Sequence, residues 1–179
     1  MSGNDRFMTS FLAEDHRRLE RLLSVVDAHP HQRDHAVYDQ FRCGLLRHIA
    51  MEEKVLLPTV QRVHGAALPI AAKLRLDHGA LASLLMLPPR PDVLTLIRAI
   101  LQAHNALEEG PEGLYATCDR SLEQEATPLL IELGKTPEVS VAPTTHKAGV
   151  VNVVRRIVAR AGYALADSMA RGTEPPESV

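Results

Sequence analysis

The stretch HIAMEEKVLLP, residues 48–58, places a histidine and a glutamate four residues apart in a segment rich in Ala, Met, Val and Leu. This composition predicts a helix, and residues four apart on a helix share one face. His48 and Glu52 therefore project in the same direction. A second stretch, HNALEE at residues 104–109, repeats the arrangement with His104 and Glu108.

A second repeat precedes each of these two stretches. The segments DHRRLERLL (15–23) and DHGALASLL (77–85) each place one histidine, His16 or His78, among leucines at helical spacing. Each of these helices is followed by one that carries the His/Glu pair. We therefore expect two helical hairpins related by an approximate twofold axis. Because short connections make neighbouring helices antiparallel, the expected fold class is all-α, an antiparallel four-helix bundle.

The expected helices span about 5–28, 35–64, 69–87 and, after the turn PPRP (88–91), the region from about 92 to 133. Two positions should interrupt them. Pro58 lacks an amide donor and should kink the second helix or end its first half. Gly110 and Pro111 should break the fourth at the matching place, just past its His/Glu pair. We expect these two breaks to keep a pocket open.

The composition changes after Pro137 to a linker without helical period, followed by an amphipathic helix at about 147–171. Its expected apolar face comprises Val150, Val153, Val154, Ile157, Ala161, Leu165 and Met169. We expect this helix to pack on its own bundle or to form a homodimer with a second chain. The predicted domains are a bundle at 1–136 and, at 137–179, the linker, the C-terminal helix and a disordered tail.

Composition excludes several function classes. The 20 Lys and Arg against 22 Asp and Glu give a net charge of -2, which does not favour nucleic acid. Cys43 and Cys118 form neither a CxxC pair nor a disulfide framework, which favours a reducing compartment and two small core residues. The N-terminus does not resemble a signal peptide, and no segment is apolar enough to span a membrane. We expect a cytoplasmic protein.

Six polar residues would face the apolar interior of this bundle. A lone histidine on an apolar face is usually a core residue, but burying six ionisable groups is costly without compensation. A shared metal explains the whole set, because imidazole nitrogens and carboxylate oxygens suit iron, manganese or zinc. Two carboxylates on opposite helices can bridge two cations, each with about two histidines. The predicted metal ligands are His16, His48, Glu52, His78, His104 and Glu108.

Other polar residues near this set are weaker candidates. The histidines in loops or at helix ends are not expected to bind the metal: His29, His31, His35, His64 and His146. The acidic neighbours of the predicted ligands are expected to be solvated or to contact the ligands from outside: Asp15, Glu53, Asp77 and Glu109. Tyr115 lies seven residues past Glu108 on the same face and can reach the pocket or a fifth coordination position, but core packing is favoured for it.

The ordered pattern His, HxxxE, His, HxxxE over residues 5–134 resembles the hemerythrin-like family of HHE cation-binding domains. The resemblance implies a non-haem di-iron centre bridged by the two glutamates, with His16, His48, Glu52, His78, His104 and Glu108 as its ligands. It also implies binding or sensing of dioxygen, nitric oxide or peroxide, or iron handling. Oxygen-carrying hemerythrins have a second histidine four residues from the one on the third helix. Leu74 and Ala82 occupy those positions here, which argues against reversible oxygen transport.

Three functional hypotheses follow. The first is a di-iron protein, with manganese or zinc as less favoured metals, that binds or reduces dioxygen, peroxide or nitric oxide in a stress response or as a sensor. It would be an enzyme if it consumed peroxide or nitric oxide. The second is a non-catalytic protein that binds, stores or donates iron. The third is a structural zinc bundle, although structural zinc sites usually have four ligands and favour cysteine.

Overall fold

All regular secondary structure in the described residues, 7–28 and 35–166 of a computed structural model, is helical. The helices are α1 (Phe7–Ala28), α2 (His35–Met51), α3 (Leu57–His64), α4 (Ala71–Leu84), α5 (Pro91–Glu109), α6 (Leu114–Ser121), α7 (Ala126–Gly134) and α8 (Ala148–Arg160). A π-helical segment, Glu52–Leu56, joins α2 to α3, and a single 3-10 turn, Glu123–Glu125, precedes α7. The predicted all-α class is confirmed.

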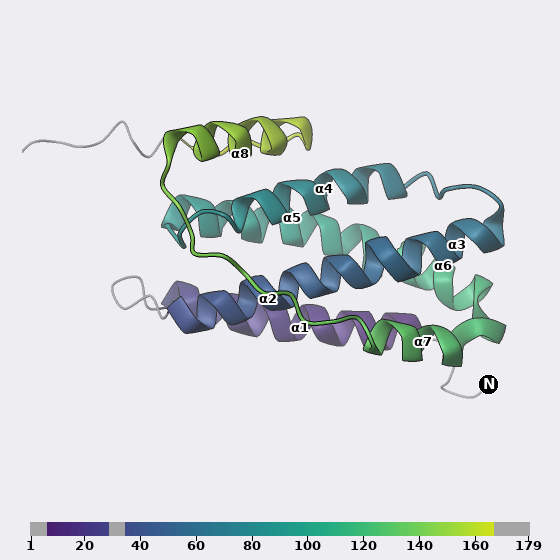
Figure 1. Cartoon of the computed structure of the whole chain (residues 1–179). Coiled ribbons are helices and arrows are strands. Elements are labelled where there is room, and N and C mark those ends of the chain that lie inside the picture. The colour runs from purple at the N-terminus through teal and green to yellow at the C-terminus, as the bar shows by residue number, and fades with distance from the viewer. Residues whose placement is uncertain (1–6, 29–34, 167–179) are drawn as a thin grey trace, which may run out of the picture.

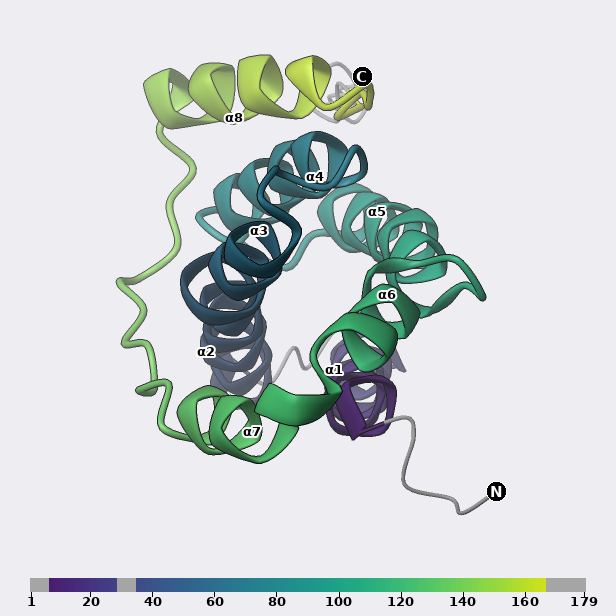
Figure 2. The ribbon, with the colours of Figure 1, turned by 90° about the vertical axis from the view of Figure 1, so that its right-hand side faces the viewer.

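The long helices lie side by side (Figure 1). Helix α1 contacts α2 and α5, α4 contacts α5, and α6 contacts both α1 and α5. In the end-on view the ribbons of α1, α2, α4 and α5 surround a common axis (Figure 2). This arrangement directs one face of each of the four helices toward the same interior.

The buried apolar residues form two clusters along this axis. One contains Leu19, Leu45, Leu81 and Leu101, and the other contains Leu12, Met51, Leu74 and Leu114. On α1, α2 and α4 a predicted metal-binding histidine falls between a member of the first cluster and a member of the second, and on α5 His104 and Glu108 follow Leu101. The apolar clusters therefore enclose a polar layer from both ends and shield it from water.

The second helix changes its hydrogen-bonding pattern at Glu52. The amide of Leu57 donates to the carbonyl of Glu52, five residues back, and Pro58 is among the first residues of α3. Because proline cannot donate a hydrogen bond, the predicted disturbance near Pro58 takes the form of a π turn immediately before it. The helix does not end there. One predicted metal ligand, Glu52, is the first residue of the π segment.

Two other predicted helix bounds were wrong. The third helix spans 71–84 instead of 69–87. The fourth is divided into α5, α6 and α7, whereas a single resumed helix to Leu133 was expected after the break at Gly110 and Pro111. The second division lies at Leu122, whose backbone leaves the helical region with φ -116° and ψ 19°.

The C-terminal helix α8 packs on α4. Its Val154 and Val158 are fully buried, whereas Val153, predicted for the apolar face, is 41% exposed. The helix ends at Arg160, and residues 161–166 are not helical, so the predicted helix to 171 was wrong. Gly162 ends it with φ 92°, a left-handed conformation that glycine adopts without steric cost. The homodimer through this helix stays a prediction, and the tail lies outside the described residues.

None of the described helices is both long and apolar enough to cross a bilayer. Both cysteines are free thiols. Cys118 is buried as expected for a core residue, but Cys43 is only half-buried, so its assignment to the core was wrong.

Candidate metal centre

The structure brings together all six residues predicted to bind metal. They come from four different parts of the fold: His16 from α1, His48 and Glu52 from α2 and the π segment after it, His78 from α4, and His104 and Glu108 from α5. None of the six is more than 6% exposed. The set is therefore a cluster of ionisable groups inside the apolar core.

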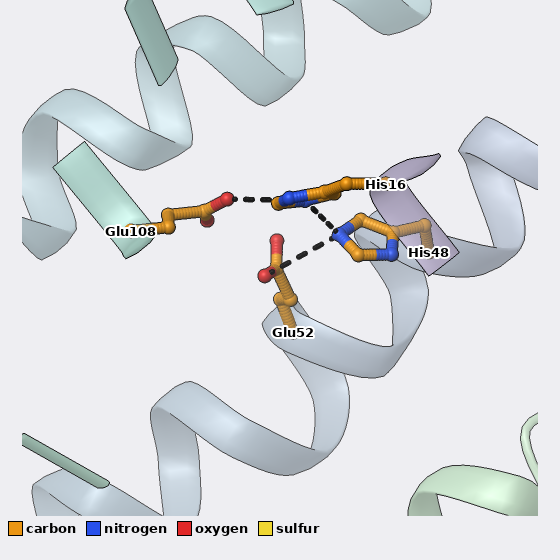
Figure 3. A group of neighbouring side chains, drawn as sticks. All are labelled: His16, His48, Glu52 and Glu108. Atoms are coloured by element: carbon orange, nitrogen blue, oxygen red, sulfur yellow. Dashed lines mark hydrogen bonds and ion pairs between the residues drawn. The ribbon is translucent and has the colours of Figure 1, made fainter. Parts of the chain in front are cut away.

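The six residues form two groups of four that share both glutamates. His16 and His48 form one group with Glu52 and Glu108, and His78 and His104 form the other with the same two carboxylates. In the first group the two Nε2 atoms are 2.9 Å apart, and Glu52 and Glu108 approach them from the π segment and α5 (Figure 3). In the second group the Nε2 atoms are 3.2 Å apart. Each carboxylate has one oxygen facing each histidine pair.

A second layer of carboxylates contacts the outer nitrogens of the histidines. Glu109 lies 2.6 Å from His16 Nδ1, and Glu53 lies 2.6 Å from His78 Nδ1. Carboxylates in this position fix the ring and assign the proton to Nδ1, leaving the Nε2 lone pair directed inward. Glu53 and Glu109 were expected either to be solvated or to contact the ligands from outside. The second expectation is the one observed, because each carboxylate contacts a histidine of the cluster.

Asp15 on α1 and Asp77 on α4 face the outer nitrogens of the other two histidines, at unequal distances. Asp15 lies 2.9 Å from His48 Nδ1. Its counterpart Asp77 lies 3.7 Å from His104 Nδ1, too far for a hydrogen bond, because its other oxygen is held at 2.6 Å by Lys73. The repeated order of contacts is the approximate twofold relation expected from the repeated sequence.

The centre contains polar atoms that the protein leaves without hydrogen bonds. Glu52 Oε2 and Glu108 Oε1 face histidine nitrogens at 3.0 and 3.1 Å, yet neither accepts a hydrogen bond in the described part of the chain. Inward lone pairs of imidazole and carboxylate repel one another unless protons or bound cations lie between them. The donor set therefore fits two divalent or trivalent cations bridged by carboxylates.

The charges within the centre shift the pKa values of its residues. Burial opposes protonation of His48, but the neighbouring carboxylates, Glu52 first and then Asp15, together outweigh it and raise the pKa of His48 to about 10. Burial likewise opposes protonation of His104, and Glu108 raises that pKa to about 10. Burial, followed by the charge of His48, lowers the pKa of His16 to about 4. A bound cation must therefore displace protons from His48 and His104.

The two carboxylates differ from each other. Burial, followed by the negative charge of Glu52, raises the pKa of Glu108 to about 7. Burial also opposes ionisation of Glu52, but His48 and His78 together outweigh it through charge and hydrogen bonding, and the pKa of Glu52 lies well below its usual value. Glu52 is therefore the more strongly ionised of the two bridging candidates.

Tyr115 is part of the centre, contrary to the expectation that it only packs in the core. It is fully buried, and its hydroxyl donates a hydrogen bond to Glu52 Oε1 at 2.7 Å. The sequence contained one signal for this placement, the seven-residue spacing from Glu108. The break at Gly110 and Pro111 made that spacing unreliable as a guide to the helix face.

The other histidines lie apart from the centre where the structure describes them. His64 is exposed and contacts Ser121, and His146 is exposed in the linker. His29, His31 and the side chain of His35 lie outside the described residues.

The fold and this cluster define a class of protein: a helical cation-binding domain with imidazole and carboxylate ligands. The family model of the hemerythrin HHE cation-binding domain matches residues 8–118, and the chain belongs to this family. The predicted family resemblance is confirmed. The matched residues include all six members of the cluster. No curated protein and no solved structure compared with the chain gives a significant match.

Proposed function

We propose that the chain is a cytoplasmic non-haem di-iron protein that binds or reduces dioxygen, peroxide or nitric oxide in a stress response or as a sensor. In this proposal α1, α2, α4 and α5 are an antiparallel four-helix bundle of two pseudo-symmetric hairpins. The bundle occupies residues 1–136, and the C-terminal segment covers α4 from outside. The single observation that carries the proposal is that two histidine pairs share both glutamates.

The proposed ligands are His16 and His48 for one iron, His78 and His104 for the other, and Glu52 and Glu108 as bridges. Bound iron supplies one-electron redox changes and coordination positions that a diatomic molecule or peroxide can take. The outer carboxylates orient the imidazoles, and the two apolar clusters exclude water from the layer between them. Iron is preferred over structural zinc because structural zinc sites favour cysteine ligands and the set contains none. Cys118 lies in the adjoining apolar cluster but is not a member of the set.

The alternative is a non-catalytic protein that binds, stores or donates iron. The cluster offers ligands for two cations among the described residues, which suits a fixed centre better than storage of many ions. Redox reaction is the property that separates the two functions. If iron is only cargo, the loaded protein has no reason to react with a small oxidant.

The test compares iron-loaded with zinc-loaded protein after addition of hydrogen peroxide, nitric oxide or dioxygen, with consumption of each followed by an electrode. We expect the iron form to consume or bind at least one of the three and the zinc form none. An iron form that reacts with none of them, and that releases its iron to a chelating acceptor, would establish the cargo function instead.

A further inference from the structure

The hydroxyl of Tyr115 lies next to one histidine pair only. Its oxygen is 2.7 Å from Glu52 Oε1, 3.2 Å from Glu108 Oε2, 3.1 Å from His16 Nε2 and 3.5 Å from His48 Nε2. A phenol has one proton and donates one good hydrogen bond, here to Glu52, and its oxygen can accept one from a protonated imidazole. Hydrogen bonding therefore accounts for two of the four close approaches and leaves two to be explained.

These four neighbours are the inward atoms of the group drawn in Figure 3. Metal ions of this kind bind nitrogen and oxygen at about 2.0 to 2.2 Å, so two ligands at a right angle lie about 3 Å apart. The Tyr115 oxygen is about that distance from all four atoms at once. A cation held by these four atoms would therefore have the Tyr115 oxygen within reach as a fifth ligand.

In residues 7–28 and 35–166 the other histidine pair has no such neighbour. Its two carboxylate oxygens, Glu52 Oε2 and Glu108 Oε1, accept no hydrogen bond from any described residue. The hydroxyl of Tyr115 contacts the opposite oxygen of each glutamate. Tyr115 therefore breaks the approximate twofold symmetry among the inward groups of the centre.

We propose that Tyr115 is a fifth protein ligand of the cation held by His16 and His48, which makes the two metal positions chemically different. The metal–oxygen bond forms as the phenol O–H bond breaks, and the proton leaves to solvent. This inference rests on the proposed metal centre and adds a ligand to one half of it. A phenol that serves only as a hydrogen-bond donor to Glu52 is the competing role.

The experiment loads wild-type protein, Tyr115→Phe and a control, Tyr38→Phe, with ferric iron. Tyr38 is equally buried but donates to the carbonyl of Leu87, in the other apolar cluster. We expect a visible charge-transfer band and phenolate Raman modes in wild type and in Tyr38→Phe, and the loss of both in Tyr115→Phe. Iron content of all three proteins is measured in parallel.

A second measurement does not depend on iron or on the folding of a variant. Addition of zinc to metal-free wild-type protein should produce the near-ultraviolet difference band of an ionised tyrosine. Wild type that binds two metals without a phenolate signal in either measurement would overturn the inference and leave the proposed function standing. Retention of the band in Tyr115→Phe would overturn it as well. Failure to bind any metal would instead overturn the metal centre itself, together with this inference.

Discussion

Each of the two central glutamates contacts one histidine of each pair, whereas each imidazole belongs to one pair only. Glu52 faces His48 with one oxygen and His78 with the other. Glu108 faces His16 and His104 in the same manner. In the proposed centre, removal of a carboxylate would affect both metal positions, whereas removal of one imidazole would affect one.

Glu52→Ala and Glu108→Ala should therefore each lose both metals, falling from about two per chain to none after dialysis. His78→Ala should lose the metal of its own pair and keep the other. Metal analysis of the three variants, with Glu112→Ala as an exposed control, measures this difference. Two metals retained in both glutamate variants would contradict the bridging assignment.

Metal binding should compete with protons at two of these residues. The pKa of His48 and of His104 is raised to about 10, so both imidazoles carry a proton at neutral pH and must lose it to bind a cation. Affinity for zinc should therefore rise with pH toward that value, and binding at neutral pH should release roughly two protons per chain from these imidazoles and roughly one more if Tyr115 is a ligand. Titration in weakly buffered solution with a pH indicator measures the release. Binding without proton release would show that these imidazoles are already neutral.

The same raised pKa values make the stability of the metal-free protein fall as pH rises, whereas they make metal affinity increase. A pKa higher in the folded than in the unfolded chain contributes stability that is fully present below the usual histidine pKa of about 6.5 and is lost as pH rises toward 10. Alkaline pH should thus weaken the metal-free fold while it strengthens metal binding.

The sequence predicted which residues form the site but not which of them contact one another. The four histidines and two glutamates could be predicted because helical spacing of four residues fixes a shared face. The pairing of histidines, and of each histidine with an outer carboxylate, depends on which helices are neighbours and on their relative register. Tyr115 was misjudged because its spacing from Glu108 crosses a loop, where the period of the helix no longer applies.

Among the structural elements, the loop between α5 and α6 is the one most closely tied to the centre. A side chain added at Gly113 would place its Cβ 2.5 Å from the carbonyl of Glu108 and 2.6 Å from that of Leu107. The loop therefore packs directly against the backbone of Glu108, a proposed bridging residue. Only glycine allows this approach.

Gly113→Ala should lower the free energy of unfolding by about 1–3 kcal/mol, as overpacking does, and should weaken metal binding. Gly134→Ala is a matched control, because a Cβ at that position meets no atom within 4 Å. Thermal or denaturant unfolding of both variants, with and without metal, measures the effect. Equal stability of the two variants would show that the loop adjusts freely.

Helix existence was predictable from apolar periodicity, whereas several helix ends were not. The periodicity of the C-terminal segment continues past Gly162, so the pattern predicted a helix to about residue 171. The left-handed conformation of Gly162 ends it instead. The π segment at Glu52–Leu56 was foreseen only as a disturbance near Pro58, because sequence shows the missing donor but not how the backbone compensates.

At the scale of the whole molecule, α8 is attached to the remainder of the fold through α4. Two valines one turn apart, Val154 and Val158, are fully buried there, while Val153 on the same helix is 41% exposed. The composition change after Pro137 indicated a separate segment. It did not indicate which helix would receive it, since several amphipathic faces were equally suitable.

Val154→Ala should lower the free energy of unfolding by about 1–3 kcal/mol through loss of buried methyl groups. Val153→Ala changes the same residue type on the same helix and should stay within about 0.5 kcal/mol of wild type. Metal content should be unchanged in both, because α8 contributes no member of the cluster. Indistinguishable unfolding curves for the two variants would contradict the observed packing of α8 on α4.

The central claim is that the polar layer inside this helical protein holds a pair of irons. Metal analysis and an absorption spectrum of protein purified without added metal test it most directly. The account predicts about two irons per chain with near-ultraviolet bands of a bridged ferric pair. Zinc alone, with no visible or near-ultraviolet chromophore of iron, would contradict it.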